Sequence, residues 1–229
     1  MKKQATKIKI CGLTEEKEAD YLNQIHADFA GMVVFFPKSK RNISLDQAKK
    51  IKAELLPEIK TVAVTVSPTL AQISQIAEAG FDLIQIHGEP ADLDIKTAKS
   101  ICEYTNKLSL PILKAFNVSD IDSYNCWQSC PSVAGFVFDA AKPGSGKTFD
   151  WTLLKSLPRS KKLFMLAGGL MPENVSNAIC FLHPDGVDVS SGVEFIEKDR
   201  PGKDPYRIQA FAEAVQLADK QLTSKYLSI

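Results

Sequence analysis

Residues 163–189, LFMLAGGLMPENVSNAICFLHPDGVDV, contain one complete strand–helix–strand unit. The short runs Leu163–Leu166 and Gly186–Val189 have the length and composition of buried strands. Between them, Pro172-Glu-Asn-Val175 opens a segment whose apolar residues have helical spacing. Strands joined in this way run parallel, because a tight hairpin can join only antiparallel strands. The stretch therefore predicts the repeating unit of a parallel α/β fold.

The same unit recurs along the whole chain. Helix-start signals precede further helical segments at Thr14-Glu-Glu-Lys17, Ser44-Leu-Asp-Gln47 and Asp204-Pro-Tyr-Arg207. An open doubly wound sheet would usually have fewer strands and a glycine fingerprint after the first one, where this chain has Cys11-Gly-Leu-Thr14. We therefore predict an α/β fold, a (β/α)8 TIM barrel with right-handed crossovers. The expected strands are Ile8–Cys11, Ala30–Phe36, Thr61–Val66, Leu83–Ile86, Pro111–Phe116, Gly135–Phe138, Leu163–Leu166 and Gly186–Val189.

Length and composition narrow the class of protein. The 229 residues are 45% hydrophobic, and 28 Lys and Arg face 27 Asp and Glu, a formal net charge of +1. This balance disfavours nucleic-acid binding, and no segment approaches the ~20 apolar residues of a membrane span. No linker-like tract divides the chain, so we expect one domain over residues 1–229 with its core at about 7–220. The last helix is expected at about 204–220, followed by a frayed tail at 221–229.

The cysteines and histidines indicate neither a disulfide framework nor a metal site. The 5 cysteines are sparse and odd in number, which is typical of a protein in a reducing cytoplasm. The 3 histidines are scattered, and Cys126 and Cys130 lack further ligands nearby, so no metal is expected. Residues 125–131 match no motif and are interpreted as a surface helix and loop. The oligomeric state is not fixed by the sequence.

Glycine-rich segments after the last two strands indicate a phosphate site. Barrel active sites lie at the carboxyl ends of the strands, where Gly168-Gly169 and Ser191-Gly192 fall. Backbone N–H groups there could hold a phosphate, helped by a short helix over residues 193–196, although each motif alone is equally consistent with a simple turn. Residues 142–151 have too few residues between their glycines for a nucleotide-binding loop, and we interpret them as a mobile loop.

Two ionisable side chains at strand ends suit acid–base chemistry. Cys11 ends the first strand and Asp139 the sixth, although the thiol could be an inert core residue and the aspartate could begin a turn. Alternation along the first strand puts Lys9 and Lys7 on the same side as Cys11, so we expect a lysine to lower the pKa of the thiol. Apolar neighbours of Asp139 should raise the pKa of its carboxyl group and keep it protonated.

Two further residues at this end are candidate binding groups. Arg41 lies in the basic loop after the second strand, where its guanidinium is suited to a substrate carboxylate, or could simply be solvated. His87 follows the fourth strand and could orient a ligand or hydrogen-bond a backbone carbonyl.

Seven motifs occur in order along nearly the whole chain. They are Lys9-Ile-Cys-Gly-Leu-Thr14, Gly31-Met-Val-Val-Phe-Phe36 with Ser39-Lys-Arg41, Gln85-Ile-His-Gly88, Phe138-Asp-Ala140, Gly146-Lys-Thr-Phe-Asp-Trp151, Leu166-Ala-Gly-Gly-Leu-Met-Pro-Glu-Asn-Val175 and Gly186-Val-Asp-Val-Ser-Ser-Gly-Val-Glu194. Taken together, these motifs resemble the phosphoribosylanthranilate isomerase family of tryptophan biosynthesis. The resemblance implies an aldose–ketose isomerase that converts N-(5-phosphoribosyl)anthranilate into 1-(2-carboxyphenylamino)-1-deoxyribulose 5-phosphate by an Amadori rearrangement, without a cofactor. It implies Cys11 as general base, Asp139 as general acid and a substrate-binding role for Asp188.

Two alternatives compete with this interpretation. A related ribose-phosphate barrel such as indole-glycerol-phosphate synthase would need lysines at the ends of the second and third strands, whereas the third ends in Val64-Thr-Val-Ser67. A non-catalytic barrel that binds sugar phosphates would need neither Cys11 nor Asp139.

Overall fold

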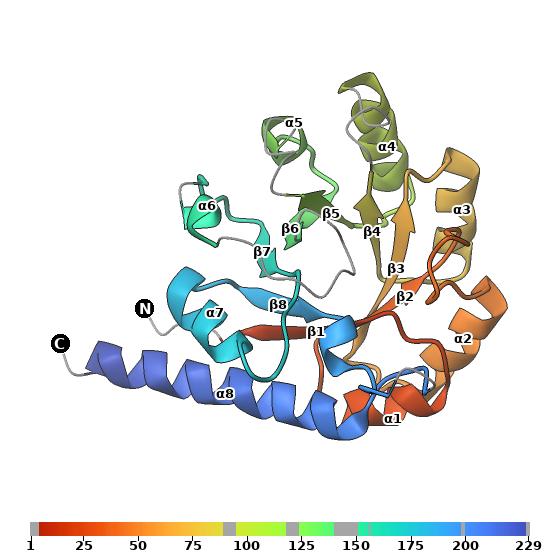
Figure 1. Ribbon diagram of the computed structural model, residues 1–229. Coiled ribbons are helices and arrows are strands. Elements are labelled where there is room, and N and C mark those ends of the chain that lie inside the picture. Colours follow the sequence, from red (N-terminus) through yellow and green to blue (C-terminus); the bar gives the residue numbers. More distant parts are fainter. Residues whose placement is uncertain are drawn as a thin grey trace.

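The structure is a closed barrel of parallel strands surrounded by helices (Figure 1). It is a computed structural model that describes residues 5–88, 95–117, 124–139, 151–155, 157–197 and 200–227. Each strand pairs with its neighbours in chain order, and β1 closes the barrel against β8. The predicted TIM barrel is confirmed; its description as one domain stays a prediction. The strands are β1 (Lys7–Cys11), β2 (Phe29–Val33), β3 (Lys60–Val66), β4 (Leu83–His87), β5 (Ile112–Asn117), β6 (Val133–Asp139), β7 (Leu163–Leu166) and β8 (Gly186–Val189).

The helices cover the outside of the barrel, and α8 lies along α7 and α1 (Figure 1). Across the described part of the chain, none is long and apolar enough to cross a membrane. They are α1 (Lys17–Gln24), α2 (Leu45–Glu54), α3 (Leu70–Glu78), α4 (Ile95–Lys107), α5 (Tyr124–Gln128), α6 (Thr152–Lys155), α7 (Val175–Leu182), the 3-10 helix η3 (Ser191–Val193) and α8 (Pro205–Leu227).

The predicted element boundaries that differ most from the structure are the ends of the second strand and of the last helix. The second strand ends at Val33 rather than Phe36, because the chain leaves the sheet there and Phe35 adopts a left-handed φ of 59°. The last helix continues to Leu227, so the expected frayed tail is helical over most of its length. Asp219 accepts hydrogen bonds from the backbone N–H and hydroxyl of Thr6, both at 2.7 Å, which fixes this end of α8 against the start of the chain.

The apolar core has two layers that follow from strand alternation. Val64, Leu113 and Met165 pack inside the barrel, while residues such as Ile84 and Phe138 belong to the larger layer between strands and helices. The buried charged side chains of Lys9 and Asp188 are paired with each other, which offsets the cost of removing them from water.

Residues 125–131 form the end of α5 and a loop, as expected from the sequence, but their position at the surface was predicted wrongly. Trp127 is only 1% exposed and belongs to the outer core layer. Cys130 forms a disulfide with Cys102 of α4, across a sequence separation of 28 residues. This pairing was not expected for sparse cysteines in a reducing environment, and it links two segments that the sequence alone could not place together.

Candidate active site

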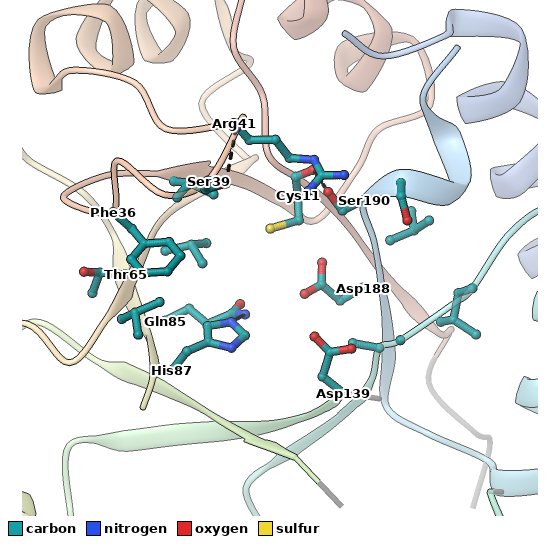
Figure 2. Close-up of a pocket in the computed structure, with 18 of the residues that line it drawn as sticks. Cys11, Phe36, Ser39, Arg41, Thr65, Gln85, His87, Asp139, Asp188 and Ser190 are labelled. Atoms are coloured by element: carbon teal, nitrogen blue, oxygen red, sulfur yellow. Dashed lines mark hydrogen bonds between the residues drawn. The ribbon is translucent and has the colours of Figure 1, made fainter. Parts of the chain in front are cut away.

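A cavity of about 180 Å³ opens at the carboxyl ends of the strands (Figure 2). The structure brings eight of the nine predicted site residues to it, and Gly192 is the one that does not line it. The lining residues are Cys11, Val33, Phe36, Ser39, Arg41, Val64, Thr65, Val66, Gln85, His87, Asp139, Ala167, Gly168, Gly169, Leu170, Asp188, Val189, Ser190 and Ser191.

Cys11 is the last residue of β1, and its thiol points into the cavity (Figure 2). Lys9, one layer deeper in the barrel, contacts it, as the alternation along the strand predicted. Gly31 of β2 leaves room for both groups, because a Cβ there would lie 3.0 Å from the Cys11 Sγ and 3.0 Å from the Lys9 Nζ.

The expected lowering of the Cys11 pKa is wrong. Burial raises the pKa of the thiol; the Lys9 ammonium lowers it, the Asp188 carboxylate raises it, and the net shift is upward. The loss of hydration of the thiolate therefore outweighs the attraction of the lysine. In the free protein, Cys11 is a protonated thiol at neutral pH.

Asp188 of β8 is held by a buried ion pair with Lys9. The Lys9 Nζ donates to both carboxylate oxygens at 2.9 Å, and the two side chains are 0% and 7% exposed. Burial alone would lower the pKa of Lys9, but Asp188 and Cys11 raise it above its ordinary value. The lysine is thus a fixed cation beneath the thiol, and it orients the Asp188 carboxylate at the cavity wall.

Asp139 ends β6 and turns its carboxylate into the same cavity as the Cys11 thiol (Figure 2). Its side chain is 9% exposed, and Phe138 beside it is fully buried. A carboxyl group and a thiol on different strands can thus reach one bound molecule. That Asp139 is protonated in the free protein stays a prediction.

His87 hydrogen-bonds a side chain rather than a backbone carbonyl. Its Nε2 lies 2.8 Å from the Nε2 of Gln85, so with the amide as donor the imidazole carries its proton on Nδ1. Burial, together with the charges of Lys114 and Lys9, lowers the pKa of His87 to about 3. The ring is neutral at physiological pH. The Gln85 Oε1 has no hydrogen-bond partner in the described structure, and sequence reasoning assigned this residue no role.

The loops after β7 and β8 meet at one side of the cavity. Gly168 and Gly169 have φ values of 83° and 66°, which favour glycine, and neither N–H donates to another described backbone group. Asn174 holds this loop by donating from its Nδ2 to the Gly169 carbonyl at 2.9 Å.

The loop after β8 differs in detail from the prediction. The short helix is η3, over Ser191–Val193, and the chain is extended again at Glu194, so the expected helix over 193–196 is wrong. Gly192 packs against the backbone of the β7 loop, where a Cβ would overlap the Leu170 carbonyl oxygen. The predicted loop at 142–151 lies outside the described residues except for its last position, Trp151.

Arg41 reaches the cavity edge and forms an ion pair that the sequence did not predict. Its Nε lies 2.5 Å from the Oε1 of Glu194, and Glu194 also contacts the buried Lys203 at 3.3 Å. The sequence patterns indicate Glu194 only as the last residue of a motif and assign no role to Lys203. No spacing signal connects Arg41 with a residue 153 positions away.

Among the described residues, no three His, Cys, Asp or Glu side chains are grouped so that they could hold a metal ion. The absence of a metal and of a cofactor stays a prediction.

Comparison with known proteins identifies the family. The family model of N-(5'-phosphoribosyl)anthranilate (PRA) isomerase matches residues 8–214. The N-(5'-phosphoribosyl)anthranilate isomerase of Moorella thermoacetica is 36% identical over 219 residues, which cover 93% of this chain and 91% of that protein. The chain belongs to the N-(5'-phosphoribosyl)anthranilate isomerase family.

Solved structures of PRA isomerases have the same fold. The enzyme from Thermotoga maritima is 34% identical and superposes with a TM-score of 0.76, over 92% of this chain and 98% of that one. A PRA isomerase in complex with reduced 1-(o-carboxyphenylamino)-1-deoxyribulose 5-phosphate is 32% identical, with a TM-score of 0.73 over the same shares. The predicted membership of the PRA isomerase family is confirmed, while the roles of individual residues stay predictions.

Proposed function

We propose that this chain catalyses the Amadori rearrangement of N-(5-phosphoribosyl)anthranilate in tryptophan biosynthesis, with Cys11 as general base and Asp139 as general acid. The observation that supports this most directly is that both side chains border one cavity, which also contains the two glycine-rich loops and Arg41. Membership of the PRA isomerase family supports the same substrate.

In this proposal the substrate is held at both ends. Its phosphate accepts hydrogen bonds from the loops of Gly168, Gly169 and Ser191, with Gly192 holding the two loops together. Its carboxylate lies against the Arg41 guanidinium at the cavity edge. His87 and Asp188 border the space between these ends and orient the ribose. Anchoring at two ends keeps the reacting carbons between the acid and the base.

The chemistry needs one proton donor and one proton acceptor. Asp139 protonates the ring oxygen, the bond from this oxygen to C1′ breaks, and an iminium ion forms between C1′ and the nitrogen. Cys11, as thiolate, removes the hydrogen of C2′, which the iminium has acidified, and leaves an enolamine. Tautomerisation moves the proton of the C2′ hydroxyl to C1′ and gives the ketone. Return of the proton from Cys11 to Asp139 through solvent restores both groups, so the isomerisation has no net gain or loss of atoms or electrons.

The raised pKa of Cys11 fits this role when the substrate charge is included. A thiol with a high pKa is rarely ionised in the free protein, but its thiolate is a strong base. The iminium puts a positive charge beside the sulfur, which lowers the thiol pKa at the step that needs the thiolate. The fixed Lys9 cation acts in the same direction.

The alternatives are less well supported. The described residues that line the cavity include no lysine, which the acid chemistry of an indole-glycerol-phosphate synthase would use. A barrel that only binds sugar phosphates gives no reason for a buried thiol opposite a carboxylate. A cytoplasmic location is part of the proposal, because phosphorylated sugars do not cross membranes.

The test is the loss of anthranilate fluorescence when the protein is added to freshly made phosphoribosylanthranilate, with EDTA present and no cofactor. Turnover should be rapid in the wild type, and it should fall by orders of magnitude in Cys11→Ser and Asp139→Asn while substrate affinity changes little. Matched controls are Cys180→Ser, a second free cysteine, and Asp46→Asn, whose side chain is 90% exposed. Wild-type protein that binds the substrate without converting it would overturn the isomerase proposal. Near-normal turnover in either active-site variant would overturn that residue's role.

A further inference from the structure

The guanidinium of Arg41 is held in a way that leaves its outer nitrogens available. The Nε is occupied by Glu194 at 2.5 Å, and both side chains are 14% exposed. The described residues provide no hydrogen-bond partner for the two Nη groups. The stem of the side chain lies against Gly12, where a Cβ would overlap the Arg41 Cδ. The Nε and the stem of Arg41 are thus held by the protein at the edge of the cavity, and the two Nη groups are left for a ligand.

Glu194 contacts three cations from two segments of the chain, the loop after β2 and the segment before α8. Its Oε1 contacts Arg41 and, at 3.3 Å, the Nζ of Lys203, while its Oε2 accepts from Lys40 at 2.8 Å. Burial would raise the pKa of Glu194, but the hydrogen bond from Arg41, the charge of Lys203 and the hydrogen bond from Lys40 together lower it to about 2. Lys40 is 72% exposed, so water screens its share of this effect more than that of the other two cations. The buried contacts to Arg41 and Lys203 therefore define the position of the carboxylate.

Lys203 connects this carboxylate to the strand that carries the proposed base. Its side chain is 1% exposed, and its Nζ donates to the Ser190 carbonyl at 3.1 Å. Ser190 in turn donates its hydroxyl proton to the Cys11 carbonyl at 2.8 Å. The Lys203 backbone N–H donates to the buried Glu18 at 2.6 Å. Lys203 is therefore held at both its backbone and its side chain, and it links Glu194 through Ser190 to the backbone of Cys11.

We propose that Glu194, held in place by Lys203, is a positioning residue that aims the terminal nitrogens of Arg41 at the substrate carboxylate. This inference rests on the proposed function, because it takes Arg41 as the carboxylate-binding residue. A free arginine side chain has many rotamers, and ordering it on binding weakens affinity. Glu194 orders the guanidinium before the substrate arrives.

The competing explanation is that the ion pair only links the loops after β2 and β8. A purely structural link would change stability and would act on all steps alike. A positioning residue changes the KM for the carboxylate-bearing substrate more than kcat, and its effect requires Arg41 to be present.

The experiment is a double-mutant cycle with Glu194→Gln and Arg41→Met, read by KM, kcat and thermal stability. Glutamine keeps the size and one acceptor oxygen of glutamate but removes the charge. We expect Glu194→Gln to raise KM about tenfold with kcat within about twofold, and to have no further effect on KM in the Arg41→Met background. Glu194→Asp, which restores the charge, should recover part of the loss.

The matched control is Asp28→Asn, which removes the partly buried Lys7–Asp28 ion pair, 3.0 Å long and outside the cavity lining. Its KM should stay unchanged. The inference is overturned if Glu194→Gln leaves KM unchanged, or raises it equally with and without Arg41. If Arg41→Met itself leaves KM unchanged, the carboxylate-binding role of Arg41 in the proposed function fails instead, and the inference falls with it.

Discussion

Replacing Gly192 by alanine tests the proposed phosphate site without changing any charge. A Cβ on this residue would overlap the Leu170 carbonyl oxygen and lie 2.9 Å from the Leu170 carbonyl carbon and 3.1 Å from the Met171 Cα. All three atoms belong to backbone, so no side chain can rotate away. The φ of Gly192 is not left-handed, so the substitution adds a collision and no conformational strain. The loops after β7 and β8 must separate.

The size of the effect follows from this collision. Carbon–oxygen contacts in proteins are rarely shorter than about 3 Å, so the loops have to move apart by on the order of 1 Å. A misplacement of that size in a substrate-anchoring group costs about 100-fold in rate. We therefore expect kcat/KM to fall about 100-fold, with a loss of stability of about 1 to 3 kcal/mol from overpacking.

The assay is the anthranilate fluorescence measurement, combined with inhibition by inorganic phosphate and with thermal unfolding. Gly80→Ala is the matched control: its φ of 70° strains an alanine, but the new Cβ would meet only the Lys52 Nζ, at 3.5 Å. It should lose stability while keeping the kinetics and phosphate inhibition of the wild type. A Gly192→Ala variant within about threefold of wild-type kcat/KM would refute the reasoning that contact between these loops builds the phosphate site.

Three buried groups give further predictions. Because the pKa of His87 in the folded protein is about 3, its NMR signals should remain those of a neutral ring down to about pH 4.5, and an NMR midpoint near pH 6 would contradict this. The free energy of unfolding should fall by up to about 1.4 kcal/mol per pH unit below about pH 6.5, because the unfolded chain takes up a proton there and the folded protein does not. Reduction of the Cys102–Cys130 disulfide should lower the free energy of unfolding by about 3.5 kcal/mol, measured with and without dithiothreitol, and an unchanged denaturation midpoint would refute it. Iodoacetamide at about pH 7 should label Cys11 far more slowly than the partly exposed Cys180, as measured by peptide mass spectrometry; faster labelling of Cys11 would show that its thiol is ionised.

The fold and the location of the site could be predicted because both depend on local patterns. Short apolar runs alternating with helical segments predict parallel strands, and the carboxyl ends of those strands meet at one end of a barrel. Polar residues at the ends of the runs, such as Cys11 and Asp139, could therefore be assigned to one cavity. The end of β2 could not be predicted, because it depends on the left-handed φ of Phe35. The end of α8 could not be predicted either, because it depends on the tertiary contact between Thr6 and Asp219.

The electrostatics of the site could be predicted only in part. Alternation along β1 correctly predicted that Lys9 lies beneath Cys11. It could not predict whether the charge of Lys9 or the burial of the thiol would decide the pKa of Cys11. That outcome depends on how much water remains around the sulfur, which no local pattern records. Glu194 and Lys203 were missed because their partners are distant in sequence and become visible only when the loops are in place.

The proposed substrate carries both a phosphate and a carboxylate, whereas the protein has a formal net charge of only +1, so the cations around the cavity have to be considered one by one. Each of these cations is already paired: Lys9 with Asp188, and Arg41 and Lys203 with Glu194. Little net field is left to attract an anion, so recognition has to come from directed donors, namely the Arg41 Nη groups and the backbone N–H groups of the glycine loops. Directed donors depend on position far more than a diffuse field does. For that reason, a methyl group added at Gly192, which alters no charge, should lower kcat/KM more than the loss of the exposed Lys40 at the edge of the cavity.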